Sequence, residues 1–433
     1  MTNLDVVIMA AGKGTRMKSE LPKVLHTLAG RALLHHVLDT AAQLKARSVT
    51  VITGHGATKV IAACVGYSQA NSHFDLKFVT QEPQLGTGHA VQQAAPVLPQ
   101  DGVTLVLSGD VPLTQSDTLA RLVAACDGQR LALLTIDFAN PTGYGRIVRE
   151  GDQVRAIVEQ KDAKEEQKQI KECYSGIMAA PTMQLKTWLA QLDDNNSQKE
   201  LYLADVVKHA VAAGTQVVAV KTADAVQVAG VNSPVQLQEL EREHQRRRAY
   251  AFMDSGVRIL DAARFDVRGD LTCGTDVCID VNCIFEGKVV LGNGVKIGAN
   301  CVIANATIAA NAVIHPFTHI DGEKLGVHVG AGALVGPFAR LRPGAVLGDE
   351  VHMGNFVEVK NSTLAKGAKA NHLAYLGDAT VGERVNYGAG SITANYDGAN
   401  KHRTVIEADV HIGSNSVLVA PVTIGAGGTV GGG

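Results

Sequence analysis

The second half of the chain carries a large apolar residue at every sixth position. Fifteen such positions fall in three phased runs, namely Ile279, Phe285, Leu291, Ile297 and Ile303, then Val329, Val335, Leu341, Leu347, Met353 and Val359, and finally Ile412, Leu418, Ile424 and Val430. Neither an α-helix nor an ordinary strand produces this repeat, because their side-chain periods are about 3.6 and 2. Repeats this short are typical of parallel β-helices with three-sided coils of about 18 residues. We therefore expect a left-handed parallel β-helix of hexapeptide repeats, with about nine coils.

Glycine usage indicates where this repetitive region begins. Residues 251–433 hold 28 of the 45 glycines, about 15% of that stretch, whereas residues 1–250 hold 17, about 7%. The second value is the average usage in proteins, and the first suits a fold with many tight corners. Two different architectures therefore follow one another in the chain.

Residues 1–232 show short apolar runs separated by amphipathic stretches. The predicted strands are Leu4–Met9, Val49–Thr53, Lys77–Thr80, Val103–Leu107, Ala132–Ile136 and Val217–Val220, and the clearest predicted helices are Leu33–Leu44 and Ser116–Ala125. Strands that alternate with helices indicate βαβ units and a mostly parallel, Rossmann-like sheet. Ligands of such sheets bind beyond the carboxyl ends of the strands, so residues that follow a strand are the candidates for a site.

A long helix is predicted between the two architectures. Ser233 is a suitable N-cap, Pro234 suits the first helical position, and Glu243 stands four residues before Arg247. The run Arg246–Arg248 could bind an anion, but we interpret it as a solvated helix face. The predicted organisation is residues 1–232, a linker helix at 233–255, and the β-helix at 256–433.

Composition excludes several classes of protein. Forty basic and 42 acidic residues leave a net charge of −2, which argues against a nucleic-acid-binding protein. Neither a signal peptide nor an apolar run of about 18 residues is apparent, so we expect no membrane span and a cytoplasmic location. The seven cysteines include no C-x-x-C pair, which disfavours a zinc site and favours free thiols.

The first predicted strand runs into a glycine-containing loop. Its sequence is Ala10-Ala11-Gly12-Lys13-Gly14-Thr15-Arg16-Met17, and Leu21-Pro22-Lys23 follow shortly after. Glycine N–H groups after a strand can approach phosphate oxygens. The spacing matches neither a Walker A loop nor the dinucleotide-binding fingerprint, which needs a glycine where Met17 stands. A simple glycine turn would not explain Arg16 and Lys23.

These residues resemble the signature A-A-G-x-G-x-R followed by P-K of sugar-phosphate nucleotidyltransferases. With the six-residue repeats behind it, the whole chain resembles the family of bacterial bifunctional N-acetylglucosamine-1-phosphate uridyltransferase/glucosamine-1-phosphate acetyltransferases. The resemblance extends through Gln81, Leu85-Gly86-Thr87-Gly88-His89, Ser108-Gly109-Asp110-Val111-Pro112, Pro141–Arg146 and Glu159. It implies an α/β nucleotidyltransferase fold before the β-helix, and synthesis of UDP-N-acetylglucosamine for peptidoglycan and lipopolysaccharide.

The resemblance implies a uridylyl-transfer site in the first part. Such transfer from UTP depends on positioning and charge neutralisation rather than on a protein nucleophile. Arg16, Lys23 and Asp110 would be catalytic, and Asp110 and Asn232 would bind Mg²⁺ through the oxygen donors that this ion prefers. The set implied to bind UTP or UDP-N-acetylglucosamine is Met9, Ala10, Ala11, Gly12, Lys23, Gln81, Gly86, Thr87, Ser108, Gly109, Asp110, Gly145, Glu159, Tyr174 and Asn232. Gln81, Gly86 and Thr87 would read uracil.

Two of these assignments have alternatives. Asp110 could be a structural cap at the end of its strand. Position 174 is often asparagine in the family, and a tyrosine hydroxyl supplies one hydrogen bond without the geometry of an amide. Gly145, Glu159 and Tyr174 are the three residues implied to hold the sugar.

The second implied site transfers acetyl from acetyl-CoA to glucosamine-1-phosphate. His372 would be the general base that takes the amine proton, since imidazole titrates near neutral pH. A lone histidine is usually a surface residue, but residues 371–378 interrupt the predicted hexad phase and 391–409 form a predicted insertion of turn-forming residues. The glucosamine-1-phosphate ligands implied are Arg342, Lys360, Tyr375 and Asn386, with Glu358 supporting the amine. The acetyl-CoA ligands implied are Ala389, whose N–H would stabilise the oxyanion, Asn395, Tyr396, Ser414 and Gly432.

The resemblance also implies a homotrimer formed through the β-helix, with acetyl-transfer sites between subunits. Three other functions are compatible with the two folds. A monofunctional nucleotidyltransferase with a solenoid tail would not need His372 and Tyr375. A non-enzymatic regulatory subunit would be expected to lose Lys23 or Asp110, and a scaffold would need none of these four residues. Because all these residues are present, the bifunctional enzyme is the favoured hypothesis.

Overall fold

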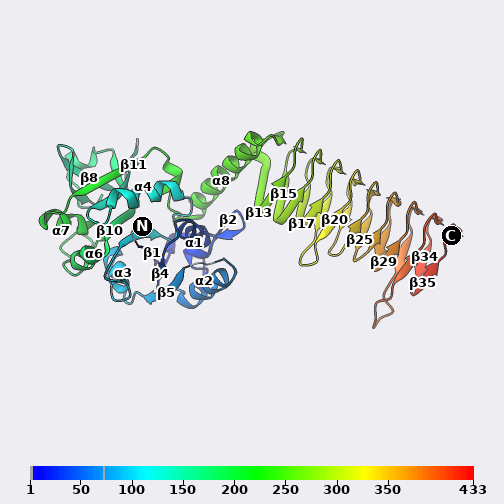
Figure 1. The fold of residues 1–433 in the computed structure, drawn as a ribbon, viewed down its shortest axis with the longest axis horizontal. Coiled ribbons are helices and arrows are strands. Elements are labelled where there is room, and N and C mark those ends of the chain that lie inside the picture. The colour runs from blue at the N-terminus through cyan, green and yellow to red at the C-terminus, as the bar shows by residue number, and fades with distance from the viewer. Residues whose placement is uncertain (1–2, 72–73) are drawn as a thin grey trace. The chain divides into compact units, whose positions relative to one another are not determined.

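The computed structural model describes residues 3–71 and 74–433. The chain divides between Leu240 and Glu241 into two compact units. Figure 1 shows that the first is an α/β unit and that the second is a parallel β-helix. Both fold classes predicted from the sequence are therefore confirmed.

Nine strands form the central sheet of the first unit. Seven lie in the order β11-β7-β10-β6-β1-β4-β5, and β8 and β9 continue from β10. Their bounds are β1 Leu4–Met9, β4 Ser48–Thr53, β5 Asp75–Thr80, β6 Val103–Ser108, β7 Leu131–Asp137, β8 Gly145–Glu150, β9 Gln153–Val158, β10 Glu172–Pro181 and β11 Val217–Thr222. All six predicted strands are present. The strand β10 was not predicted, and it runs antiparallel to β6 and β7 in an otherwise parallel row.

Helices cover both faces of this sheet. Their bounds are α1 Leu33–Gln43, α2 Ala57–Asn71, α3 Thr87–Ala94, α4 Ser116–Cys126, α5 Glu165–Lys168, α6 Thr182–Leu189 and α7 Val206–Ala212, and a small hairpin joins β2 Thr27–Leu28 to β3 Arg31–Ala32. Alternate residues of β1 face opposite layers: Val6 and Ile8 share a buried cluster with α1, α2 and α4, whereas Val7 shares one with α3, α6 and α7. This alternation is what a three-layer α/β/α unit requires.

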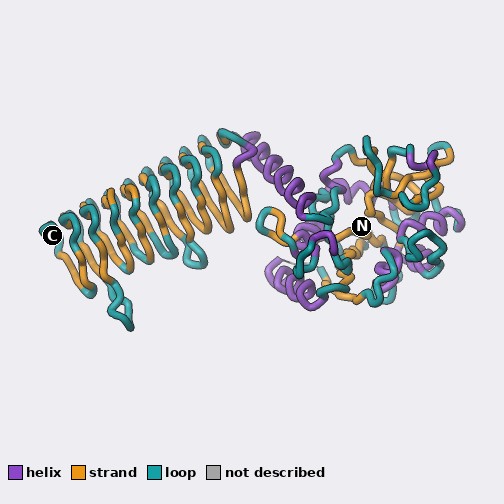
Figure 2. The backbone as a smooth tube through the Cα atoms, turned by 180° about the vertical axis from the view of Figure 1, so that it is seen from behind, coloured by secondary structure: helices purple, strands orange, loops and turns teal. Residues whose placement is uncertain are grey.

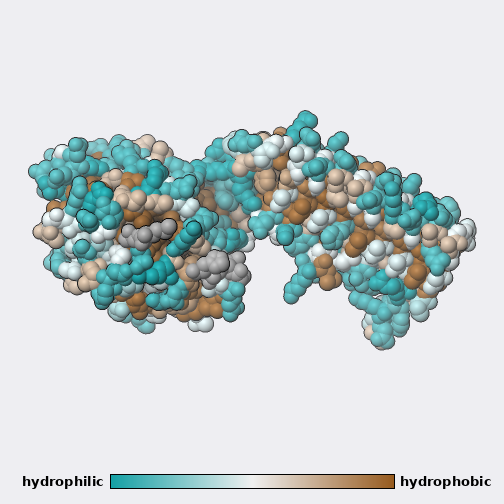
Figure 3. All heavy atoms as spheres, in the orientation of Figure 1, coloured by the Kyte–Doolittle hydropathy of each residue, from teal (hydrophilic) through white to brown (hydrophobic). Residues whose placement is uncertain are grey.

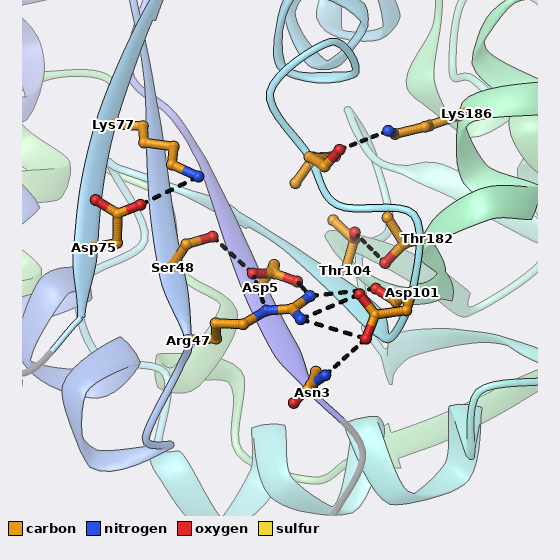
Figure 4. A network of polar contacts seen from close by, with 11 residues as sticks. Asn3, Asp5, Arg47, Ser48, Asp75, Lys77, Asp101, Thr104, Thr182 and Lys186 are labelled. Carbon is orange, nitrogen blue, oxygen red and sulfur yellow. Dashed lines mark hydrogen bonds and ion pairs between the residues drawn. The ribbon is translucent and has the colours of Figure 1, made fainter.

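Polar side chains at the amino ends of the strands bond to one another (Figure 4). Asp5 in β1 is fully buried, and its carboxylate accepts hydrogen bonds from Arg47 Nη2 at 2.6 Å and Ser48 Oγ at 2.7 Å. Arg47 also pairs with Asp101 at 3.1 Å. This end of the sheet is a closed structural network, whereas the carboxyl ends leave polar groups available for a ligand.

The β-helix consists of a ten-stranded sheet along one face and a fifteen-stranded sheet that includes the strands of the other two. The first sheet contains β12 Arg258–Ile259, β14 Cys278–Ile279, β16 Lys296–Ile297, β18 Val313–Ile314, β21 Leu334–Val335, β24 His352–Asn355, β27 Lys369–His372, β30 Asn386–Tyr387, β33 His411–Ile412 and β36 Thr429–Val430. The second contains β13 Phe265–Cys273, β15 Cys283–Leu291, β17 Val302–Ile308, β19 His319–Asp321, β20 Val327–Val329, β22 Arg340–Leu341, β23 Val346–Leu347, β25 Glu358–Lys360, β26 Thr363–Leu364, β28 Tyr375–Gly377, β29 Ala379–Val381, β31 Ile392–Ala394, β32 Thr404–Ile406, β34 Val417–Val419 and β35 Val422–Ile424.

The hexad positions form the interior of this β-helix. Thirteen of the fifteen are buried, and Ile424 and Val430, near the chain end, are partly buried. The ten strands along one face are close to the nine coils expected. The six-residue period therefore predicted the core of this unit residue by residue.

Two local predictions about the β-helix were wrong. Residues 371–378 do not interrupt the repeat, because Ala370 and Leu376 are six apart and both fully buried. The phase had already shifted at a five-residue step between Val359 and Leu364. Residues 391–409 are not one insertion either, since β31 and β32 inside this range pair with neighbouring coils. Within this range, residues 395–403 between β31 and β32 form the loop that leaves the wall of the β-helix (Figure 2).

The long helix α8 spans Pro234–Asp254. Ser233 Oγ accepts from the Gln236 N–H at 3.3 Å, and Arg247 donates to Glu243 at 2.7 Å, as the cap and the i,i+4 pair predicted. The interpretation of Arg246–Arg248 as a solvated face was wrong for Arg248. Its guanidinium donates to the carbonyls of Val267 at 3.1 Å and of Gly269 at 2.9 Å, both in β13. Gln245 of α8 also bonds to both backbone groups of Val267, at 2.9 Å each, so two side chains of this helix cover the outer edge of β13 on the first coil of the β-helix.

No helix in the described ranges is both long and apolar enough to cross a membrane. All seven cysteines are free. Residues 3–71 and 74–433 contain no group of three or more His, Cys, Asp or Glu side chains placed to hold a metal ion.

Candidate active sites

A cleft of about 410 Å³ lies at the carboxyl ends of β1, β5 and β6. Ten residues implied by the motifs line it, namely Met9, Ala10, Ala11, Gly12, Lys23, Gln81, Gly86, Thr87, Ser108 and Asp110. Gly109 lies behind this lining, where its N–H donates to the Met9 carbonyl at 2.9 Å. The parallel strands bring these dispersed segments to one edge, as the sheet topology requires.

The loop after β1 has open space above one glycine and close packing at the other. A Cβ at Gly12 would meet nothing within 4 Å, whereas a Cβ at Gly14, where φ is +60°, would lie 2.7 Å from the Lys23 Cβ. Gly14 therefore lets the loop pack against Lys23. Arg16 is exposed in the 3₁₀ turn Thr15–Met17, and no carboxylate in the described part of the chain pairs with it. This guanidinium is available for an anionic ligand.

Lys23 and Asp110 form an ion pair at the cleft, with side chains only 15% and 13% exposed. Lys23 Nζ also donates to Asn232 Oδ1 at 3.0 Å, and Ser108 Oγ donates to the other Asp110 oxygen at 2.5 Å. Asn232 reaches this place because the Val231 N–H donates to the Asp110 carbonyl at 2.9 Å. The two residues implied to bind Mg²⁺ therefore already converge on one positive charge.

This donor set fits a magnesium ion. Asp110 and Asn232 each offer a hard oxygen, and Mg²⁺ commonly takes one or two protein ligands and fills its remaining positions with water and phosphate oxygens. The Lys23 ammonium demonstrates that the two oxygens can face a common cation.

The end of the cleft formed by Gln81, Gly86 and Thr87 is rigid. Gly86 has φ +109°, and a Cβ there would lie 2.6 Å from the Leu201 carbonyl, so only glycine fits this close approach. Thr87 Oγ1 accepts from the Leu203 N–H at 3.0 Å, which leaves its hydroxyl hydrogen to donate elsewhere. Gln81 is buried, and its amide nitrogen donates to the Gly86 carbonyl at 2.9 Å.

The three residues implied to hold the sugar lie together: Gly145 begins β8, Glu159 directly follows β9, and Tyr174 is on β10. Gly145 pairs with Tyr174 across β8 and β10, and a Cβ at Gly145 would be 3.3 Å from Glu159 Oε1. Burial raises the pKa of Glu159, and the charges of Asp205 and Asp162 raise it further. The Tyr174 ring packs in a buried cluster, and its hydroxyl has no hydrogen-bond partner among the described residues. None of the three residues is among those that line the cleft of about 410 Å³.

On the β-helix, His372 is exposed at the end of β27. Its Nδ1 lies 3.2 Å from Asn355 Oδ1 on the preceding coil, where β24 pairs with β27. Because the Asn355 oxygen can only accept, this contact is a hydrogen bond when Nδ1 carries the hydrogen, and in that tautomer of the neutral ring Nε2 has a free lone pair. A hollow of about 410 Å³ beside His372 is lined by Phe338, Phe356 and Asn355 among others. Asn355 could not be predicted from the sequence, because only the pairing of the coils places it beside His372.

A basic cluster lies on the neighbouring face. Arg342, Glu358, Lys360 and Tyr375 belong to or follow the paired strands β22, β25 and β28, and Arg342 donates to Glu358 at 2.8 Å. The ammonium of Lys401, burial and the charge of Arg342 all lower the pKa of Lys360. Lys401 could not be predicted as part of this cluster, because it lies 41 residues after Lys360 in the chain. Three cations gathered here suit a phosphate group.

The remaining implied residues lie in three places. Ala389, Ser414 and Gly432 occur on successive coils near His372: the Gly390 N–H donates to the His372 carbonyl, the Asn415 N–H to Ala389, and the Gly433 N–H to Ser414. Asn386 is exposed on β30, beside Lys369 of β27. Asn395 donates to the buried Asp378, whereas Tyr396 is exposed on the loop 395–403.

Comparison with known proteins agrees with this geometry. The family model described as the MobA-like NTP transferase domain matches residues 6–176. Proteins named bifunctional protein GlmU match almost the entire chain: the one from Polaromonas naphthalenivorans (strain CJ2) is 75% identical over 99% of this chain and 92% of its own length. The chain belongs to the family of bifunctional GlmU proteins. A relative from Albidiferax ferrireducens is 73% identical over 99% of this chain and 94% of its own, and one from Herminiimonas arsenicoxydans is 55% identical over 99% and 93%.

Membership of the GlmU family confirms the resemblance drawn from the motifs. The chain is a bifunctional enzyme of UDP-N-acetylglucosamine synthesis, a uridylyltransferase and an acetyltransferase. The nucleotidyltransferase match falls entirely within the first unit.

Proposed function

We propose that the cleft of the first unit transfers uridylyl from UTP to N-acetylglucosamine-1-phosphate with the residues described above. The observation that carries this assignment is the Lys23 ammonium, which is held between Asp110 and Asn232 beside the glycine loop. The loop N–H groups and Arg16 bind the triphosphate, and Gln81, Gly86 and Thr87 bind uracil. Gly145 and Glu159 hold the sugar, and Tyr174 lies beside Gly145 on the neighbouring strand.

In this reaction a phosphate oxygen of the sugar attacks the α-phosphorus of UTP, and the bond to pyrophosphate breaks. Positioning and neutralisation of charge supply the catalysis. Lys23 neutralises the α-phosphate, and Arg16 neutralises the leaving pyrophosphate. When bound by Asp110 and Asn232, Mg²⁺ would supply further neutralisation of the phosphate oxygens.

On the β-helix, His372 Nε2 takes a proton from the amine of glucosamine-1-phosphate. The amine nitrogen then attacks the thioester carbon of acetyl-CoA, and the bond to sulfur breaks. The hydrogen bond from Nδ1 to Asn355 supports this role because it keeps the lone pair on Nε2. Arg342, Lys360 and Lys401 bind the sugar phosphate, Tyr375 and Asn386 bind the sugar, and the Ala389 N–H stabilises the oxyanion. Asn395, Tyr396, Ser414 and Gly432 contact acetyl-CoA.

We also propose that the β-helix forms a homotrimer. Phe317, Phe338, Phe356 and Leu373 form an apolar ridge along one corner, each between 47% and 60% exposed. The first three rings stack at centroid distances of 5.0 and 5.4 Å, and Leu373 adjoins His372. Figure 3 shows apolar residues at the surface of this unit on the face in view. An apolar ridge beside an open site suits a second copy of the chain that completes the site.

A cytoplasmic location follows from the proposed chemistry. UTP and acetyl-CoA are consumed as co-substrates, and the seven free cysteines suit a reducing compartment.

One assay tests the proposed function directly. The protein is incubated with glucosamine-1-phosphate, acetyl-CoA, UTP and Mg²⁺, and UDP-N-acetylglucosamine is measured by chromatography. Omission of acetyl-CoA should abolish the product, and added N-acetylglucosamine-1-phosphate should restore it. Product formed without either acetyl source, or none in the complete mixture, would contradict the proposal.

A further inference from the structure

Asp378 is a buried carboxylate on the β-helix to which the reaction described above gives no role. It forms the corner between β28 and β29, where its φ is +51°, and it is only 8% exposed. Its two carboxylate oxygens accept from different segments, Oδ1 from Asn361 Nδ2 at 2.5 Å and Oδ2 from Asn395 Nδ2. A buried carboxylate is costly unless it is hydrogen-bonded, and these two amides satisfy it.

The main chain of Asp378 bonds to two further segments. Its N–H donates to the Lys360 carbonyl at 3.1 Å, and its carbonyl accepts from the Thr404 N–H at 3.2 Å. Asn395 is the first residue of the loop 395–403, and Thr404 is the first residue after this loop. Asp378 therefore contacts both ends of the loop and the strand that carries Lys360.

The loop 395–403 is itself an ordered hairpin. Tyr396 and Lys401 pair as an antiparallel bridge, and the Asn395 carbonyl accepts from the His402 N–H at 2.8 Å. Nearer the turn, His402 Nε2 lies 2.6 Å from an Asp397 carboxylate oxygen. Because the hairpin is held together by its own bonds, the contacts at its two ends decide where Lys401 lies.

Lys401 must be held against the repulsion of a second cation. It lies beside Lys360, whose pKa its ammonium lowers, and the charge of Asp378 acts in the opposite direction on that pKa. Two like charges this close repel each other when no anionic ligand lies between them. A fixed hairpin keeps both cations in place before the phosphate binds, which removes part of the cost of binding.

We propose that Asp378 is a positioning residue for acetyl transfer: by bonding to Asn395 and Thr404 it fixes the hairpin 395–403, so that Lys401 and Lys360 bind the sugar phosphate together. This inference rests on the acetyl-transfer site proposed above. Asp378 touches neither substrate in this role, and it acts through the residues that it holds.

Three variants test the bond between Asp378 and Asn395. Asp378→Asn keeps the size of the side chain, but its one oxygen cannot accept from both Asn361 and Asn395 in the same way. Asn395→Asp places a second carboxylate against Asp378. In the double variant, the amide at position 378 can donate to the carboxylate at position 395 and still accept from Asn361, so both hydrogen bonds return.

Asp409→Asn is the matched control. Asp409 also forms a corner of the β-helix, with φ +59°, but its carboxylate pairs with the exposed Arg384 at 2.7 Å. The same change of residue type in the same backbone conformation therefore leaves the hairpin contacts intact.

The experiment measures kcat and the KM for glucosamine-1-phosphate in acetyl transfer, together with hydrogen exchange of the amides of residues 395–404. For Asp378→Asn we expect this KM to rise about tenfold or more, because a hydrogen bond to a charged group is lost. The kcat should change less than about threefold. Exchange should become faster in residues 395–404 and stay unchanged in the rest of the β-helix.

The other variants complete the cycle. Asn395→Asp should raise the KM at least as much as Asp378→Asn, and the double variant should return it to within about threefold of wild type. Asp409→Asn should keep the wild-type KM and exchange. Uridylyl transfer, which belongs to the other unit, serves as the control for the amount of intact protein.

Two results would overturn the inference. If Asp378→Asn keeps the wild-type KM and the wild-type exchange of residues 395–404, the hairpin is held without this carboxylate. If Asp378→Asn lowers kcat at an unchanged KM and the double variant does not recover, Asp378 only supports the fold. A wild-type protein that does not acetylate glucosamine-1-phosphate would contradict the proposed function instead, so the two failures are distinguishable.

Discussion

In the first unit ten of the implied residues line a cleft at the carboxyl ends of the strands, whereas on the β-helix the implied residues stand on the outside of coils whose interior is already filled. The ion pair of Lys23 and Asp110 is largely shielded from solvent, while His372 is exposed. A sheet with open carboxyl ends can enclose a substrate within one chain. A closed apolar prism cannot, so a site on its surface needs a second surface to exclude water.

This difference predicts that the two activities fail independently. Asp110→Ala should lower uridylyl transfer by at least about 10³-fold, because Lys23 loses its carboxylate and Mg²⁺ loses a ligand. Acetyl transfer should stay near wild type. His372→Ala should show the reverse, with an acetyl-transfer loss of about 10²- to 10⁴-fold. Each half-reaction is assayed in both variants, with circular dichroism as the control for folding. Loss of both activities in one well-folded variant would refute two independent sites.

Assembly should matter only to the second site. Phe338→Glu together with Phe356→Glu places two charges on the apolar ridge, and we expect this variant to be monomeric by light scattering. Acetyl transfer should then fall by about 10²-fold or more while uridylyl transfer changes less than about twofold. Glu350→Gln, an exposed change elsewhere on the β-helix, is the matched control. A monomer with full acetyltransferase activity would show that one chain completes the site.

A substitution at the amino ends of the strands tests whether the stability of the first unit depends on residues outside its catalytic cleft. Arg47→Met leaves the fully buried Asp5 with only the Ser48 hydroxyl. We expect the free energy of unfolding of this unit to fall by about 2–3 kcal/mol. In thermal unfolding, the transition of the β-helix should stay in place. A shift of both transitions would show that the two units unfold together.

The smallest expected effect concerns Glu159, whose pKa is raised by burial and then by Asp205 and Asp162. A raised folded-state pKa means that this group favours the fold when protonated, and that this stability is lost as the pH rises through that pKa. Glu159→Gln should therefore unfold like wild type at about pH 4 and be more stable at about pH 8. Its KM for N-acetylglucosamine-1-phosphate should rise, since the carboxylate that holds the sugar is absent. Equal stability at both pH values would contradict the assigned burial effect.

Patterns within a few residues were predicted well. The hexad positions are the interior of the β-helix, and β1 ends at Met9 directly before the glycine loop, as expected. Ser233 and Pro234 begin α8 at the predicted place. Each of these features depends on side-chain period or on a cap, which a short stretch of sequence contains in full.

Contacts between distant segments were not predicted. The antiparallel strand β10 joins β6 and β7, the Arg248 guanidinium reaches β13, and Lys401 lies beside Lys360. The shift of phase after Val359 likewise depends on how one coil stacks on the next. The sequence by itself determined the two architectures, the buried positions and the motif residues, because local periodicity and residue type specify them. Only the tertiary structure decided which of those residues lie together. Strand pairing and contacts between charged groups join segments that are far apart in the chain, and no short stretch of sequence shows which segments will pair.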